Sequence, residues 1–143
     1  MRSPDLLTAV GIGVSDMKRS VDFYSRVIGM KVTQTFKLDH MDETILSFEG
    51  RTAVVLMHYT DGSKQHYKDN PVKLVFYFTD PKAVAARIRS AGYEITREPE
   101  PLPSFGHAIV GLAKDPDGYV IELLESPVAK SADTTKAAAA GGN

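Results

Sequence analysis

Hydrophobic and polar residues alternate with a period of two in several short segments, whereas two longer segments repeat their hydrophobic residues at the helical period. These alternating segments, together with short segments that are mostly apolar, predict strands, and the helical segments predict helices. The predicted strands lie at Leu6–Val14, Lys31–Lys37, Thr44–Glu49, Thr52–Tyr59, Val72–Phe78 and Tyr93–Arg97, followed by a strand pair within Ala108–Glu125.

Signals at the helix ends support both helices. Ser15-Asp16 offers a side-chain cap for the first helix, and Gly29 ends it. Asp80-Pro81 begins the second helix with a cap followed by a proline at the first helical position, and Gly92 ends it.

Three segments are predicted to lack regular structure. Asp61–Asn70 is polar and is expected to be an exposed loop. Glu98–Ser104 contains three prolines, which lack the amide hydrogen that a regular element needs, so a stiff loop is expected. Ser126–Asn143 is small, polar and rich in alanine, and is predicted to be a flexible C-terminal tail.

The order strand–helix–strand–strand–strand occurs twice. The copies lie about 64 residues apart, since Val14–Lys18 matches Phe78–Lys82. An internal duplication of this kind constrains the architecture more firmly than any single element. The predicted fold class is α+β, with two βαβββ modules forming a curved, partly open barrel. We expect one domain over residues 6–125, with modules at about 6–60 and 71–125.

The segment AIVGLAKDPDGYVIELLE (Ala108–Glu125) carries the strongest chemical signal. Its turn residues, Asp115–Gly118, predict a tight hairpin because proline and Asp-Gly suit turn positions. On the second arm Val120, Glu122 and Leu124 share one face, since strand side chains alternate. A carboxylate among apolar neighbours needs a metal, a cation or a proton. Glu122 is therefore a candidate catalytic residue.

The repeat also predicts which residues face Glu122 across a cavity between the modules. Ala9 corresponds to Lys73 on the first strand of each module, and Leu56 corresponds to Glu122 on the last strand. These four positions are expected to converge on the middle of the cavity. His58 has the same strand parity as Leu56, so it is expected to face the same way.

The composition limits the partners. The chain has 143 residues, a net charge of −1 and no cysteine, so nothing favours nucleic acid or an anionic membrane, and thiol chemistry is excluded. It contains neither the hydrophobic core of a signal peptide nor an apolar run of membrane-spanning length. We therefore expect a cytoplasmic protein that binds a small-molecule substrate or ligand.

Two segments point to a known family. VGIGVSDMKRSVDFYSRVIGMKV (Val10–Val32) and DPDGYVIELLE (Asp115–Glu125) resemble the vicinal oxygen chelate superfamily, and within it glyoxalase I, lactoylglutathione lyase. The resemblance spans roughly Leu6 to Glu125. It implies the two-module fold described above and a homodimer, which in this family often forms by exchange of modules.

The resemblance also implies a metal site that this sequence does not preserve. Glyoxalase I holds a divalent ion with His or Gln, Glu, His and Glu at the positions of Ala9, Leu56, Lys73 and Glu122, so one ligand of four matches. No metal is therefore expected at that position, because a single carboxylate cannot hold an ion that takes four to six ligands. A zinc or nickel ion would require His58 or His107 to join Glu122.

Two further positions bear on the substrate. Arg26 matches the arginine that pairs with a glutathione carboxylate in the human-type enzyme, while Thr60 replaces an asparagine that helps to hold glutathione. Arg26 thus retains glutathione as a candidate co-substrate. Tyr77 shares the inner face with Lys73 and is expected to form part of the cavity wall.

The pairing of Lys73 with Glu122 leaves two hypotheses open. In one, the ion pair is structural and contributes little net stability. In the other, Glu122 removes a proton beside a carbonyl group and Lys73 stabilises the enolate oxygen, assisted by His58. His107, at the start of the hairpin, is either a proton shuttle or a surface residue.

Three functions follow. The first is a glyoxalase-I-like lyase or isomerase with a degenerate metal site, acting on a small carbonyl-bearing or glutathione-conjugated substrate. The second is a metal-free protein of the bleomycin resistance type that binds or sequesters a small ligand. The third is a true metal-dependent glyoxalase with substituted ligands.

Overall fold

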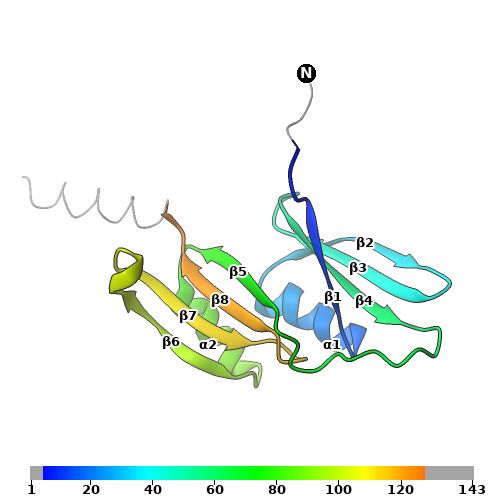
Figure 1. Cartoon of the computed structure of the whole chain (residues 1–143). Coiled ribbons are helices and arrows are strands. Elements are labelled where there is room, and N and C mark those ends of the chain that lie inside the picture. The colour runs from blue at the N-terminus through cyan, green and yellow to red at the C-terminus, as the bar shows by residue number, and fades with distance from the viewer. Residues whose placement is uncertain (1–4, 128–143) are drawn as a thin grey trace, which may run out of the picture. The chain divides into compact units, whose positions relative to one another are not determined.

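The computed structural model describes residues 5–127, which form two compact units. The first unit comprises residues up to 70 together with 116–118, and the second comprises 71–115 together with the residues from 119 onward. Each unit contains one four-stranded sheet and one main helix (Figure 1). The predicted repeat of strand–helix–strand–strand–strand is confirmed in both halves. Most of the predicted tail, 126–143, lies outside the described residues.

The first unit follows the repeat with one modification of its helix. Asp16 caps the helix by accepting a hydrogen bond from the Arg19 amide, and the last turns widen into a π-helix. The strand order is β1-β4-β3-β2, with β1 parallel to β4 and the other pairs antiparallel. Its elements are β1 (Ala9–Gly13), α1 (Met17–Asp22), η1 (Phe23–Val27), β2 (Lys31–Lys37), β3 (Met41–Ser47) and β4 (Ala53–Tyr59).

The second unit repeats this arrangement. Asp80 caps its helix by accepting from the Ala83 amide, and Pro81 occupies the first helical position, as predicted. The strand order is β5-β8-β7-β6, with β5 parallel to β8. Its elements are β5 (Lys73–Phe78), α2 (Pro81–Ser90), β6 (Ile95–Leu102), η2 (Pro103–Phe105), β7 (Ala108–Lys114) and β8 (Val120–Glu125).

The prediction of an irregular loop at Glu98–Ser104 is wrong, because β6 extends through Pro99 and Pro101. β6 is an edge strand that pairs only with β7, so a missing amide hydrogen on its outer side breaks no ladder. The register shifts twice along this pair, after Ile95 and after Arg97, which accommodates the prolines. The other strand predictions are correct in type and differ only at their ends.

The two faces of the second sheet differ sharply. Leu123 and Ile121 of β8 and Phe76 of β5 are buried on the face that packs against α2, which lies behind the sheet in Figure 1. The opposite face carries alternate residues of the same strands, which pair in register as Lys73 with Val120, Val75 with Glu122 and Tyr77 with Leu124. We call these six residues the open face, because α2 does not cover them.

The hairpin between β7 and β8 is anchored by hydrogen bonds. The Asp115 amide donates to the Tyr119 carbonyl, and the Tyr119 amide donates to the Asp115 side chain. Gly118 has a φ of +88°, as the predicted turn requires. Asp117 is buried and accepts hydrogen bonds from the amide and the hydroxyl of Ser15. No helix within residues 5–127 is long and apolar enough to cross a membrane.

Candidate functional site

Lys73 and Glu122 meet on the open face of the second sheet. Lys73 Nζ lies 3.2 Å from Glu122 Oε1, within hydrogen-bonding and ion-pair distance. The Glu122 side chain is 10% exposed and the Lys73 side chain 53% exposed, so a largely buried carboxylate faces a cation that solvent reaches. The expected ion pair is therefore present. It places a carboxylate next to a positively charged hydrogen-bond donor.

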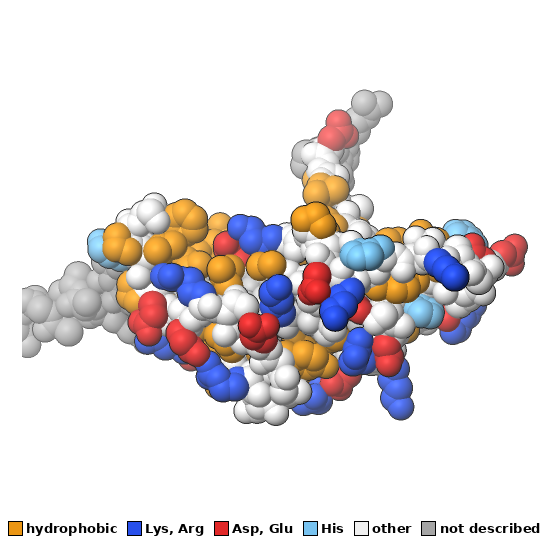
Figure 2. Space-filling view, turned by 60° about the horizontal axis from the view of Figure 1, so that its bottom comes forward, with side chains coloured by type: hydrophobic (Ala, Val, Ile, Leu, Met, Phe, Trp, Pro, Cys, Tyr) orange, Lys and Arg blue, Asp and Glu red, His pale blue; other side chains and the backbone are white. Residues whose placement is uncertain are grey.

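The ion pair adjoins apolar surface. One rung further along the parallel β5–β8 pair, Tyr77 lies opposite Leu124, and Val75 lies opposite Glu122 itself. Val75 is 52% exposed and Tyr77 is 63% exposed. Figure 2 shows hydrophobic side chains gathered at the left, where Figure 1 places the second unit. A molecule bound at the ion pair would thus contact apolar side chains.

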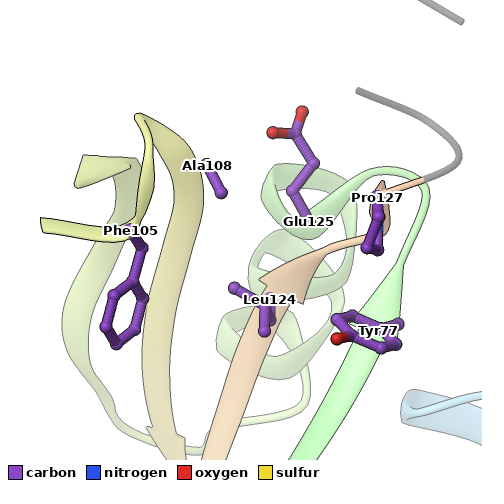
Figure 3. A pocket seen from close by; sticks show the side chains of 6 residues that line it. All are labelled: Tyr77, Phe105, Ala108, Leu124, Glu125 and Pro127. Atoms are coloured by element: carbon purple, nitrogen blue, oxygen red, sulfur yellow. The ribbon is translucent and has the colours of Figure 1, made fainter. Parts of the chain in front are cut away.

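A pocket of about 280 Å³ lies at the far end of this surface. Tyr77 comes from β5, Leu124 from β8 and Phe105 from η2, and the rings of Phe105 and Tyr77 lie on either side of Leu124 (Figure 3). We call this pocket the apolar hollow. Its lining consists of Tyr77, Phe105, Ala108, Leu124, Glu125 and Pro127.

Tyr77 lines this hollow within the second unit, while its predicted place in the wall of a cavity between the modules stays a prediction. His107 precedes Ala108 of the hollow, is exposed and has a φ of +63°. Its amide donates to the Leu102 carbonyl, which closes the turn after η2. His107 is thus near the hollow in sequence but is not one of its lining residues, and its role as a proton shuttle stays a prediction.

The expected convergence of Leu56 and Ala9 on one face is wrong. Leu56 pairs in register with Ile12, and Leu56 is fully buried, so these two point into the core of the first unit. Ala9 has the opposite parity to Ile12. The residue of β4 that faces the same side as Ala9 is Val55, because Val55 pairs with Gly11, two residues after Ala9. Neither Leu56 nor Val55 offers a metal ligand.

His58 follows Leu56 in parity, as predicted, and therefore turns toward the core side of the first sheet. Its Nδ1 lies 2.8 Å from the Val14 carbonyl oxygen, and its ring stacks on Tyr67 with the centroids 5.8 Å apart. These contacts fix the ring within the first unit. The catalytic role predicted for His58 stays untested, and its surroundings are those of a structural residue.

Arg26 lies on the surface of the first unit and is engaged by a neighbour. Its Nε and Nη2 each donate to the Asp22 carboxylate at 2.9 Å, one helical turn earlier. This hydrogen bonding lowers the pKa of Asp22 below its ordinary value of 3.8. Thr60 is exposed at the end of β4, and its amide donates to the His40 carbonyl. A substrate carboxylate at Arg26 would have to compete with Asp22.

Replacing Arg26 with Gln should raise the pKa of Asp22 toward its ordinary value. Because folding lowers this pKa, the pair stabilises the protein above pH 3.8, and the stabilisation is lost as the pH falls through the lowered pKa. Both side chains are more than a third exposed, so the contribution is below about 0.5 kcal/mol. An NMR titration of the Asp22 carboxyl carbon measures the shift, with Arg51→Gln as the control. An unchanged pKa in Arg26→Gln would contradict the assignment.

Within residues 5–127, no group of three or more His, Asp or Glu side chains lies close enough together to hold a metal ion. The lining residues of the hollow other than Tyr77 were not predicted as site residues: Phe105, Ala108, Leu124, Glu125 and Pro127. Leu124 could be found from its parity with Glu122. Phe105 lies in a short turn whose path no periodic pattern encodes, so its position could not be predicted from the sequence.

The fold is a repeated module with an acidic residue on the last strand of its second copy. Comparison with known families identifies the class of protein that has this fold. A profile of the Glyoxalase/Bleomycin resistance protein/Dioxygenase superfamily matches residues 6–123, and the chain belongs to this superfamily. Within it, the chain is similar to lactoylglutathione lyase of Salmonella typhimurium, at 34% identity over 119 residues, covering 79% of this chain and 87% of the relative.

Solved structures agree. The V278E mutant of glyoxalase I from Zea mays superposes with a TM-score of 0.72 at 27% identity, covering 82% of this chain and 43% of that one. The trypanothione-dependent glyoxalase I of Leishmania major gives a TM-score of 0.73 at 22% identity, covering 98% of this chain and all of that one (100%). The second likeness shows the fold alone.

Proposed function

We propose that this protein is a glyoxalase-I-like isomerase that acts without a metal on a small carbonyl-bearing or thiol-conjugated substrate. The observation that carries the proposal is the Lys73–Glu122 pair, a buried carboxylate 3.2 Å from an ammonium group on an otherwise apolar face. The similarity to lactoylglutathione lyases supports the reaction class. The same proposal includes a cytoplasmic location and a homodimer. Light scattering measures the oligomeric state.

The residues present do not fit a divalent metal. Of the four positions that the resemblance assigns to ligands, Ala9 and Leu56 carry no donor atom, and Val55, which faces the same side as Ala9, carries none either. The Lys73 ammonium, hydrogen-bonded to Glu122, would repel a cation. The metal-dependent alternative is therefore not favoured by the chemistry of the donor set.

The ion pair can perform a proton transfer without a metal. Glu122 takes the proton from the carbon beside the carbonyl group. The electron pair of the broken C–H bond forms a carbon–carbon double bond, and the π pair of the carbonyl group moves onto its oxygen. The Lys73 ammonium stabilises the resulting negative oxygen, and its solvent-exposed position leaves room for a substrate there. Glu122 then returns the proton to the former carbonyl carbon, while the hydroxyl group on the neighbouring carbon loses its proton and becomes the new carbonyl group. The former carbonyl oxygen takes up a proton through solvent, so the isomerisation balances with no external reagent.

The test is the isomerisation of the hemithioacetal formed from methylglyoxal and glutathione, measured with chelator present. Replacing Lys73 with Met should lower kcat by about tenfold to 100-fold, because the enolate oxygen loses its charged donor. Lys73→Arg should retain part of the activity. Normal turnover of a folded Lys73→Met protein would contradict the catalytic role and favour the structural hypothesis.

The apolar hollow favours a second candidate function, the metal-free binding of a small apolar ligand. A ligand that covers exposed rings such as Tyr77 and Phe105 removes their apolar surface from water, which stabilises the complex. In this case the chelated protein would bind aromatic molecules and show no turnover with any hemithioacetal. Turnover that depends on Glu122 decides against this candidate as the whole function.

A further inference from the structure

A second lysine, on β7, lies on the same side of the sheet as the Lys73–Glu122 pair. In the antiparallel β7–β8 ladder, Leu112 pairs with Glu122. Two residues further along β7, Lys114 pairs with Val120. Residues that pair in register point to the same side of a sheet, so Lys114 shares the side of Glu122. Val120 also pairs with Lys73 of β5, so the two lysines flank Val120 from the strands on either side of β8.

The ammonium group of Lys114 is available to a ligand. Lys114 is half-buried, and within residues 5–127 its side chain forms no ion pair or hydrogen bond. By contrast, Lys73 is hydrogen-bonded to Glu122. Arg97 of the neighbouring strand β6 donates its Nε to the Val110 carbonyl at 3.3 Å. Lys114 is therefore a cation beside the candidate base that no protein group engages in the part of the chain that the structure describes.

The charge around Val120 is positive. Strands β5, β8 and β7 place two lysines, Lys73 and Lys114, and one glutamate, Glu122, on this side of the sheet, where their other residues are valine, leucine and tyrosine. Two positive charges thus face one negative charge. Apolar neighbours lower the local dielectric constant, which strengthens the attraction of the second lysine for an anion.

The spacing of the strands suits a small molecule that both lysines hold. Neighbouring strands lie about 4.8 Å apart, so the backbones of Lys73 and Lys114 are about 10 Å apart. Both side chains are long enough to converge above Val120. In the proposed reaction Lys73 receives the carbonyl oxygen of the substrate. An anionic group attached to the carbonyl carbon would then lie on the side of Lys114.

We propose that Lys114 binds a carboxylate of the substrate, and that the substrate is a small 2-oxo acid with a hydroxyl group on the next carbon. This inference rests on the proposed function, which assigns the carbonyl oxygen to Lys73 and the proton to Glu122. With such a substrate the C–H bond at C3 breaks and a C–H bond forms at C2. The C3 hydroxyl becomes the carbonyl group and the C2 carbonyl becomes a hydroxyl. Lys114 holds the carboxylate throughout and determines specificity.

Binding is tested with two probes of similar shape, pyruvate and its neutral amide pyruvamide, which both lack the hydroxyl group that the isomerisation needs. In chemical-shift titrations of the full chain, pyruvate should bind about tenfold more tightly than pyruvamide. Lys114→Met should remove this preference, and Lys114→Arg should retain it. Lys82→Met makes the same change at an exposed position of α2 and should alter neither Kd.

Turnover is tested, with chelator present, on 3-hydroxypyruvate and dihydroxyacetone, which share the carbonyl and hydroxyl groups and differ in the carboxylate. Lys114→Met should raise KM for 3-hydroxypyruvate about tenfold and leave its kcat unchanged, because a contact made equally in the ground state and the transition state is lost. Both constants for dihydroxyacetone should stay the same. A merely structural role of Lys114 would change the turnover of both compounds alike.

Equal affinity for pyruvate and pyruvamide, tighter binding of inorganic phosphate than of pyruvate, or a preference for pyruvate that survives in Lys114→Met would overturn the proposal. Failure of the proposed function would look different. A Lys114-dependent preference for pyruvate without any turnover of 3-hydroxypyruvate or the hemithioacetal would keep the carboxylate site and remove the catalytic role of Glu122. Glu122-dependent turnover of the hemithioacetal without a preference for pyruvate would remove the carboxylate site alone.

Discussion

Replacing Glu122 with Gln should lower kcat for hemithioacetal isomerisation by about 100-fold or more, because it removes the base that accepts the substrate proton. Gln has nearly the same shape as Glu, and its amide oxygen can still accept the hydrogen bond that Lys73 donates to Oε1. KM should change little, since the contacts on the open face remain. Steady-state kinetics in the presence of chelator measure both quantities.

The variant needs two controls. Glu94→Gln makes the same chemical change at an exposed position in the turn before β6, and it should retain full activity. Thermal unfolding of Glu122→Gln should follow that of the wild type, because Lys73 is half exposed and keeps its hydration when the carboxylate is removed. Wild-type turnover by a folded Glu122→Gln protein would exclude Glu122 as the base.

A third readout separates proton transfer from binding. While the Glu122 carboxyl holds the substrate proton, that proton can exchange with deuterium from deuterated water. The longer the carboxyl stays protonated, the more deuterium the product should contain. Glu122→Gln should abolish this exchange together with turnover. Exchange that persists in the variant would assign the proton transfer to another group, such as His107 beside the hollow.

The Lys73–Glu122 pair could be predicted from the sequence because β5 and β8 are uninterrupted. Strand parity and the repeat then place both side chains on one face, and the observed register confirms it. The same argument failed at Leu56, although the strand itself was predicted. Ala9 of β1 pairs with Ala53 of β4, and its counterpart Lys73 of β5 pairs with Val120 of β8, so Ala53 corresponds to Val120. Two residues further along each strand, the counterpart of Glu122 is therefore Val55. An alignment error of one residue moves a strand side chain to the opposite face.

The hollow and β6 show what sequence patterns leave out. Pro99 and Pro101 argue against a strand in any local pattern, and only the edge position of β6, a property of the whole sheet, permits them. Phe105 reaches the hollow through the 3-10 turn η2, which no hydrophobic period specifies. Such residues depend on how a loop is folded against strands distant in sequence, so the structure is needed to identify them.

Replacing Gly118 with Ala should destabilise the protein by about 2–4 kcal/mol. Gly118 has a φ of +88°, where an L-residue costs about 1–2 kcal/mol. An added Cβ would also lie 2.0 Å from Asp69 Oδ1, so the Asp69 carboxylate would have to rotate away. It would lie 3.3 Å from the Asp69 amide nitrogen, so the backbone of the two segments would have to separate by a few tenths of an ångström. The Asp69 amide donates to the Asp117 carbonyl at 2.8 Å, and this bond would be strained as well. Urea denaturation measures the loss.

The chain supplies a matched control that isolates the steric part of this loss. Gly92, after α2, has a φ of +91°, and its added Cβ would meet nothing within 4 Å, so Gly92→Ala should cost only the conformational part, about 1–2 kcal/mol. Asp69→Gly removes the clashing carboxylate and suits the φ of +53° at that position. In this background Gly118→Ala should cost no more than Gly92→Ala does. Equal destabilisation by Gly118→Ala and Gly92→Ala in the wild-type background would contradict the prediction. It would mean that the close approach of Gly118 and Asp69 adds no steric contribution to the loss of stability.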